Sequence, residues 1–66
     1  MKNNVRYERK KINMTQENLA LLIGVSRQTI NAIETEKYNP SVLLALKLSD
    51  VLKVSVNELF IIEQND

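Results

Sequence analysis

The chain has 66 residues, a net charge of +1 and an apolar content of 44%, so it is long enough for one small domain and too short for two. It contains no cysteine and no histidine, which excludes a disulfide framework, a zinc finger and a Cys or His nucleophile. Its first residues are polar and charged, and its apolar runs are far shorter than a membrane span. We therefore expect one domain over residues 1–66, in the cytoplasm, with no metal or other cofactor and no membrane contact.

The charge is distributed unevenly along the chain. Residues 1–40 carry seven Lys or Arg and four Asp or Glu, a net charge of +3, whereas residues 41–66 carry two and four, a net charge of −2. This distribution suits a protein that faces phosphate groups with its N-terminal part only. Ordinary surface charge is the alternative interpretation.

The first 23 residues predict two helices. One runs from Val5 to Ile12 and ends before Asn13, a residue that tolerates the left-handed conformation after a helix. The next runs from Gln16 to Ile23, with Thr15 as its N-cap. Its apolar residues fall on one face and comprise Leu19, Ala20 and Ile23.

A tight turn and a third helix follow. Gly24 supplies the positive φ that the turn needs at low steric cost. Ser26 caps a helix from Arg27 to Glu34, in which Ile30 and Ile33 point inward. Two short helices joined by a three-residue turn form a helix-turn-helix module.

Two more helices complete an all-α domain. Pro40 prevents helical continuation from upstream, and Ser41 caps a fourth helix from Val42 to Leu52. Ser55 caps a short fifth helix from Val56 to Leu59. The expected fold is a compact five-helix bundle with the helix-turn-helix at its centre.

The residues after the fifth helix predict a strand. Phe60, Ile61 and Ile62 form an apolar, β-branched run, and the segment around Asn3 to Val5 is the one available partner of similar character. We therefore expect a small two-stranded antiparallel clasp between the chain termini.

The polar side of the third helix is suited to reading DNA. Arg27 and Asn31 are four residues apart and Gln28 is adjacent, so all three share a face opposite the inward isoleucines. Gln28 is suited to bidentate pairing with adenine, Arg27 to guanine or phosphate, and Thr29 to a thymine methyl group or a phosphate oxygen. A solvated helix face is the alternative interpretation of the same pattern.

Other polar residues are candidates for contacts with the DNA backbone. Gln16 lies at the start of the second helix, where free backbone N–H groups and the positive end of the helix dipole attract phosphate. Lys37, Tyr38 and Asn39 follow the third helix and can contact phosphate and sugar without reading sequence. Ser26 completes this set of predicted DNA contacts. The alternatives are an exposed glutamine, a solvated lysine and a tyrosine packed on the domain edge.

Several motifs occur together in a specific order: Thr15-Gln16-Glu17-x-Leu19-Ala20, Gly24-Val25-Ser26-Arg27-Gln28-Thr29-Ile30, then Glu34 and Asn39-Pro40-Ser41. On these motifs the chain, from about Val5 to Phe60, resembles the Cro/C1-type (XRE) helix-turn-helix regulators. The resemblance implies a bundle of five helices, a DNA-binding repressor that acts as a dimer, and an ion pair between Arg9 and Glu34. It also supports the phosphate contact of Gln16.

Some residues depart from the family pattern. Glu36 and Lys53 stand after the third and fourth helices, where glycine is frequent, so each is expected in the left-handed conformation at a cost of about 1 kcal/mol. The charge of Glu36 also repels nearby phosphate. Leucines occupy positions that are usually polar, and they are either incidental or contacts with another chain: Leu21, Leu22 and Leu43.

A dimer is expected because one module reads only a few base pairs, whereas twofold pairing places two reading helices in successive major grooves about 34 Å apart. The acidic C-terminal part has least to gain from DNA, so the predicted dimer interface comprises Val56, Asn57 and Phe60.

Three classes of function remain open from the sequence. The favoured one is a transcriptional regulator, a repressor that binds an inverted-repeat operator in double-stranded DNA as a homodimer. The alternatives are the antitoxin of a toxin-antitoxin pair, which uses the same module and a protein partner, and an interaction bundle without DNA binding. No enzyme is expected, since no cluster of carboxylates converges with a nucleophile.

Overall fold

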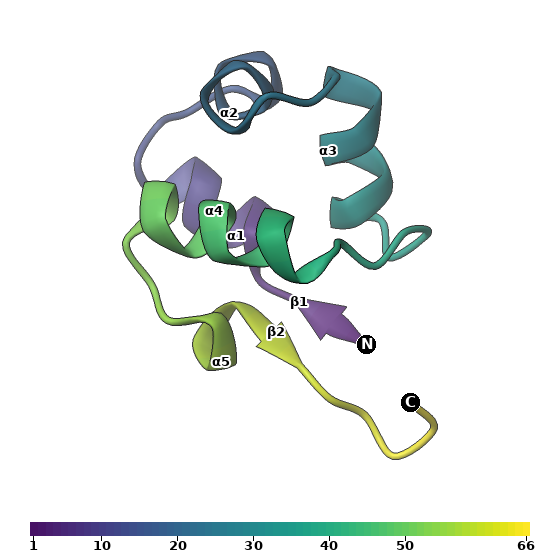
Figure 1. The fold of residues 1–66 in the computed structure, drawn as a ribbon. Helices are drawn as coiled ribbons and strands as arrows, with labels where there is room; N and C mark the ends of the chain where they lie inside the picture. Colours follow the sequence, from purple (N-terminus) through teal and green to yellow (C-terminus); the bar gives the residue numbers. More distant parts are fainter.

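The computed structural model describes residues 1–66 and contains five helices and one two-stranded sheet (Figure 1). The predicted five-helix bundle and the predicted bounds of α2, α3, α4 and α5 are confirmed. The first helix ends at Lys11, one residue before the predicted end. In chain order the elements are β1 (Lys2–Asn3), α1 (Val5–Lys11), α2 (Gln16–Ile23), α3 (Arg27–Glu34), α4 (Val42–Leu52), α5 (Val56–Leu59) and β2 (Phe60–Ile61).

Four of the helices begin at a hydroxyl side chain that accepts a hydrogen bond from a free backbone N–H. A Ser or Thr in this role stabilises a helix by about 1 kcal/mol relative to alanine. At α5 the Glu58 carboxylate also accepts from the Ser55 backbone N–H, at 3.4 Å, which completes a capping box. The hydroxyl-to-nitrogen distances are 3.0 Å for Thr15 and Asn18, and 3.2 Å for Ser26 and Thr29, Ser41 and Leu44, and Ser55 and Glu58.

Four residues at helix ends adopt left-handed conformations, as predicted. Gly24 has a φ of 77° at the end of α2, and its N–H donates to the Ala20 carbonyl at 2.9 Å. Asn13, Glu36 and Lys53 have φ values of 57°, 63° and 60°. For the two charged residues this conformation costs about 1 kcal/mol each, because their Cβ atoms crowd the backbone.

One apolar core joins the helices. α2 packs against both α3 and α4, and α1 reaches the same core through Val5. The inward positions predicted for α2 and α3 are confirmed. The buried apolar residues are Val5, Leu19, Ala20, Ile23, Ile30, Ile33, Leu48, Leu52, Leu59 and Phe60.

The predicted antiparallel clasp between the termini is present, with shorter strands than the expected segments. Lys2 pairs with Ile61 and Asn3 with Phe60, so the strand ends at Asn3 instead of extending to Val5. The chain turns at the residue before Val5, because Val5 is buried and begins α1, and its N–H donates to the Asn3 side-chain oxygen at 3.2 Å. Ile62 lies outside the sheet.

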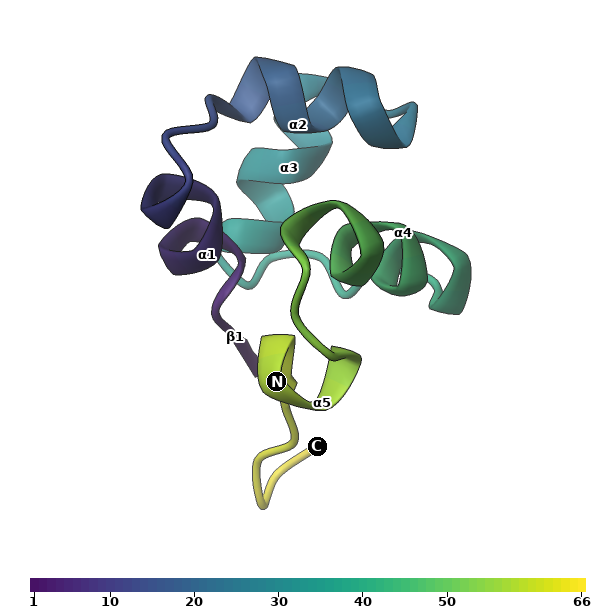
Figure 2. The same ribbon diagram turned by 90° about the vertical axis from the view of Figure 1, so that its left-hand side faces the viewer.

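The clasp and the α2–α3 turn lie at opposite ends of the molecule. Both views place α2 and the α2–α3 turn at one end, and α5, the strands and both termini at the other (Figures 1 and 2). None of the five helices combines the length and the hydrophobicity that a bilayer crossing requires.

Candidate nucleic-acid interface

The third helix presents a polar side to solvent and is anchored by its apolar side. Ile30 and Ile33 have no exposed surface, whereas Arg27, Gln28 and Asn31 are exposed. The isoleucines fix the rotation of α3 about its axis, since rotating it would expose them to water. The structure therefore places the three predicted base-reading residues together on one outward face.

The start of α3 is tightly held. Ser26 is exposed, and its hydroxyl caps the helix and also lies 3.0 Å from the Thr29 hydroxyl. Thr29 is half-buried, and this contact limits its freedom to turn toward a base. Of the predicted reading residues, Thr29 is thus the least exposed.

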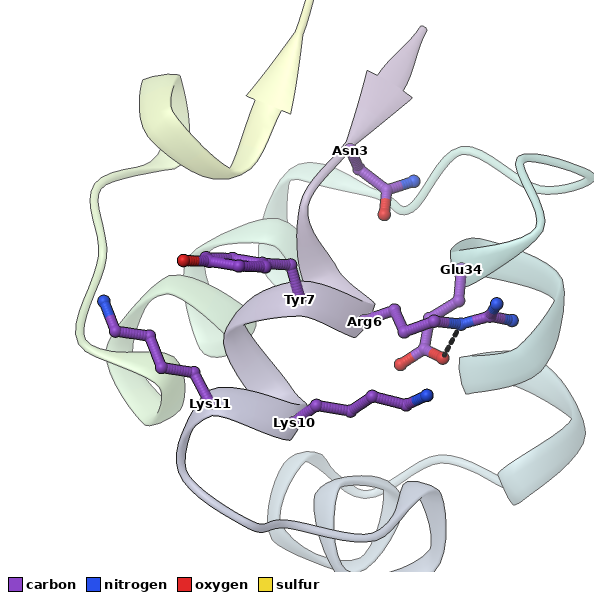
Figure 3. A pocket seen from close by; sticks show the side chains of 6 residues that line it. All are labelled: Asn3, Arg6, Tyr7, Lys10, Lys11 and Glu34. Carbon is purple, nitrogen blue, oxygen red and sulfur yellow. Dashed lines mark hydrogen bonds and ion pairs between the residues drawn. The ribbon is translucent and has the colours of Figure 1, made fainter.

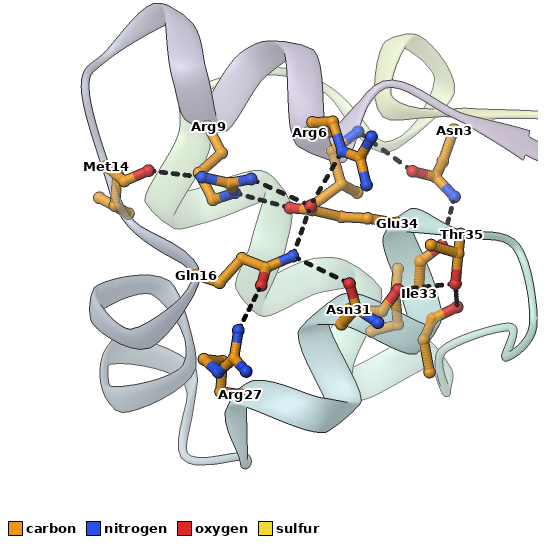
Figure 4. Close-up of polar contacts among 12 residues, drawn as sticks. Asn3, Arg6, Arg9, Met14, Gln16, Arg27, Asn31, Ile33, Glu34 and Thr35 are labelled. Atoms are coloured by element: carbon orange, nitrogen blue, oxygen red, sulfur yellow. Dashed lines mark hydrogen bonds and ion pairs between the residues drawn. The ribbon is translucent and has the colours of Figure 1, made fainter.

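Gln16 links α2 to three residues of α3, namely Arg27, Asn31 and Glu34 (Figure 4). Its side-chain nitrogen donates to the Glu34 Oε1 at 3.0 Å and to the Asn31 Oδ1 at 3.3 Å. Its side-chain oxygen accepts from the Arg27 Nη1 at 3.2 Å. Gln16 was predicted only as a phosphate contact, and the structure shows that it also sets the positions of two predicted base-reading side chains.

The predicted contact between Arg9 and Glu34 is present and largely buried. The Arg9 Nε donates to Oε2 at 2.7 Å and the Nη2 to Oε1 at 3.0 Å, while the Nη1 donates to the Met14 carbonyl at 2.8 Å. The pair joins α1 to the last residue of α3 and so holds α3 against the rest of the bundle.

This arrangement lowers the pKa of Glu34 below its ordinary value. Burial acts to raise that pKa, but the hydrogen bonds from Arg9, Gln16 and Arg6, together with the positive charge of Arg9, outweigh it. The same contact raises the pKa of Arg9 through its hydrogen bonds to Glu34. Both groups are therefore ionised at neutral pH.

The sequence interpretation missed Arg6. Its Nε lies 3.4 Å from the Glu34 Oε1, so two arginines of α1 approach one carboxylate (Figure 4). The available signal was the spacing, because Arg6 is three residues before Arg9 and shares one side of the helix with it.

A polar hollow of about 430 Å³ lies at the start of α2 and has no apolar residue in its lining. It combines free N–H groups of a helix N-terminus with two arginines, which is the chemistry of an anion site. No group of acidic side chains in the structure is arranged to hold a metal ion. The hollow is lined by Arg9, Thr15, Gln16, Glu17 and Arg27.

The three predicted backbone contacts after α3 are all exposed. Lys37 and Tyr38 both donate their backbone N–H to the Ala32 carbonyl, at 2.9 and 3.2 Å, so the loop turns back over the end of α3. Asn39 follows them at the surface, and Glu36 directly precedes them. The loop thus presents one positive and one negative charge beside the reading helix.

The residues predicted for the dimer interface are unequally available. Asn57 is exposed and Val56 is half-buried, whereas Phe60 is only 9% exposed and belongs to the core. Phe60 follows a buried leucine and lies in the clasp, so its ring fills the domain interior. It therefore offers little surface to a partner.

Known proteins match this chain over most of its length. Residues 5–59 match the family model described as Helix-turn-helix (HTH_3). An uncharacterized HTH-type transcriptional regulator of Methanocaldococcus jannaschii is 48% identical over 66 residues, which cover all of both chains.

Two solved structures have a similar fold. The P22 c2 repressor, solved in complex with a synthetic operator, superposes with a TM-score of 0.83 and 32% identity, covering 86% of each chain. The restriction-modification controller protein C.AhdI of Aeromonas hydrophila superposes with a TM-score of 0.78 and 34% identity, covering 85% of each chain. The fold and the positions of the helices are thus those of proteins with a helix-turn-helix.

Proposed function

The chain belongs to the helix-turn-helix family of Cro/C1 (XRE) type, and on that basis we propose that it is a transcriptional repressor which reads the DNA major groove with α3. The observation that carries this proposal is the outward polar face of α3, backed by two fully buried isoleucines. A helix fixed in this way can enter a groove about 12 Å wide without rearranging the core.

The side chains on that face differ in what they recognise. Gln28 has both a donor and an acceptor free for the major-groove edge of adenine, and Arg27 can bind the two acceptors of guanine. In the free protein Arg27 is hydrogen-bonded to Gln16. When Arg27 binds a base, this hydrogen bond either holds the arginine in place or has to rearrange. Asn31 lies farther along the same face.

The DNA backbone would be held on both sides of the reading helix. The free N–H groups at the N-terminus of α2 supply donors for one phosphate, and Gln16 adds another when its amide releases Asn31 or Glu34. Lys37 supplies a charge for a second phosphate, with Tyr38 and Asn39 beside it. Such contacts fix the orientation of the module and make its affinity dependent on salt concentration.

We further propose a homodimer on an inverted-repeat operator. Asn57 and the exposed part of Val56 form the candidate interface, at the end of the molecule opposite the α2–α3 turn. The P22 c2 repressor, with a TM-score of 0.83 to this chain, was solved on a synthetic operator, which supports the operator-binding part of this proposal.

Selection of bound sequences from random double-stranded DNA tests the proposal directly. The expected result is one motif repeated about a twofold axis, with half-site centres about 10 base pairs apart. An unrepeated half-site, together with a monomer in sedimentation at high micromolar concentration, would contradict the dimer. No salt-dependent binding to any sequence would contradict DNA recognition and favour an interaction bundle.

A further inference from the structure

The outward side of α1 carries three positive charges around an exposed tyrosine, and the predicted DNA contacts do not include them. Tyr7 is 64% exposed. Aromatic and basic side chains surround an open hollow of about 640 Å³, seen in Figure 3. The hollow is lined by Asn3, Arg6, Tyr7, Lys10, Lys11 and Glu34.

These charges point in two directions. Arg6 and Lys10 are four residues apart on the helix and extend together toward Glu34 and the end of α3 (Figure 3). Tyr7 and Lys11 extend toward the opposite side (Figure 3). One helix therefore presents two cations on the side of the reading helix and a third cation away from it.

Arg6 carries a charge that the protein does not neutralise. Its one hydrogen bond runs from Nε to the Glu34 Oε1 at 3.4 Å, an oxygen that already accepts from Arg9 and from Gln16. Because Arg9 neutralises Glu34 at two points, Arg6 remains a positive charge whose side chain is 53% exposed. Lys10 forms no ion pair and is also exposed.

Arg6 lies close to Gln16 at the start of α2. Arg6 Nε and Gln16 Nε2 contact the same oxygen atom, so they are separated by no more than the sum of those two short distances. Successive phosphates of one strand are about 3.4 Å apart along the duplex axis. A strand held by Gln16 therefore passes within reach of Arg6, and Lys10 extends to the same side of α1, toward Glu34 (Figure 3).

We propose that Arg6 and Lys10 form a second phosphate-binding surface, which contacts the DNA backbone outside the base pairs read by α3, on the side of the α2 N-terminus. This inference rests on the proposed DNA binding. A DNA strand is favoured over an acidic protein as the partner, because Arg6 meets Gln16 at the shared Glu34 oxygen and Lys10 extends to the same side of α1. Its expected effect is affinity without sequence preference.

Two DNA duplexes separate this surface from the rest of the interface. One ends at the last base pair of the selected site, and the other continues five base pairs further at each end. The wild-type chain should bind the longer duplex about tenfold more tightly at 0.1 M salt, with a salt slope steeper by about 1 to 2. The Arg6→Ala/Lys10→Ala variant should lose most of this preference, whereas Lys11→Ala should retain it.

Fluorescence anisotropy between 50 and 300 mM KCl measures all these affinities. Because every variant is measured on the same two duplexes, any effect of duplex length alone is the same for all of them and cancels in the comparison. Lys10→Ala alone should lose about half of the length preference, and it leaves the contacts of Glu34 untouched in case the double variant folds poorly. A length preference retained in Lys10→Ala and in a folded double variant would overturn the inference. So would the finding that Arg6 and Lys10 bind an acidic protein and not DNA. Failure of the wild-type chain to bind either duplex would instead reject the proposed function.

Discussion

Arg9 and Glu34, which are 25 residues apart in the chain, form a two-point contact with a shortest distance of 2.7 Å between Nε and Oε2. The Glu34 side chain has no exposed surface and Arg9 is 7% exposed, so removing the carboxylate leaves a buried positive charge without its partner. The pair also ties α1 to the end of the reading helix. Its loss should affect both the stability of the domain and the position of α3.

We expect Glu34→Ala to lower the free energy of unfolding by about 3 kcal/mol, the lower end of the range for breaking a buried ion pair. Urea denaturation followed by circular dichroism measures this change. The exposed Glu17→Ala substitution, on α2, is a matched control and should change stability by less than about 0.5 kcal/mol. An unchanged melting temperature in Glu34→Ala would show that the pair does not hold the fold.

The same carboxylate predicts how stability depends on pH. Because the folded-state pKa of Glu34 is lowered, its contribution is complete above the pKa of the unfolded chain, about 4.5, and is lost as the pH falls through the lower folded-state value. Urea midpoints should therefore stay nearly constant from pH 7 to pH 5 and fall below pH 4.5. In Glu34→Gln this fall in the urea midpoint should be smaller. An identical fall in both proteins would assign it to other carboxyl groups. Asp66 is one of these, because a backbone hydrogen bond from Glu63 also lowers its pKa.

Gln28 and Lys37 should affect DNA binding in different ways. Gln28→Ala should relax the preference at one base position by about 1–3 kcal/mol and leave binding to unrelated sequences unchanged. Lys37→Ala should weaken binding to all sequences similarly and reduce the salt slope by about one. Repeating the selection and the salt titration with both variants checks this. A loss of preference at one base position in Lys37→Ala would contradict its role as a backbone contact.

The two charged residues in left-handed conformations provide a matched pair. Replacing Glu36 or Lys53 with glycine should raise the free energy of unfolding by about 0.5–1 kcal/mol, because glycine adopts a positive φ without crowding. Only Glu36→Gly should also tighten DNA binding, since Glu36 precedes the predicted backbone contacts and its charge repels phosphate. Equal DNA affinities for the two variants would show that Glu36 does not face the duplex.

The helices could be predicted from the sequence because their ends depend on local chemistry. A hydroxyl at Thr15, Ser26, Ser41 or Ser55 caps the residues that follow it, and apolar spacing identifies the buried face. The exposed positions of Arg27, Gln28 and Asn31 follow from the same spacing. Such features require only residues within one or two turns.

The remaining features depend on residues far apart in the chain. The end of β1 depends on Val5, which enters the core and begins α1, so the strand ends at Asn3, two residues earlier than expected. Phe60 is in the core because the clasp folds it inward, so no local pattern distinguishes it from an interface residue. The contacts of Glu34 with Arg6 and Gln16 span 28 and 18 residues. The spacing of Arg6 and Arg9 shows that they share a side of α1, but it does not show which carboxylate they meet.

The paired termini have a practical consequence. The ammonium group of Met1 lies 2.8 Å from the Asp66 Oδ1, next to the β1–β2 ladder and far from the α2–α3 turn. A short peptide bridge could therefore fuse the first residue to the last, and new ends could be opened in a surface loop to give a circular permutant. A dye or an immobilisation handle placed at that seam for single-molecule measurements would lie at the end of the molecule opposite the α2–α3 turn.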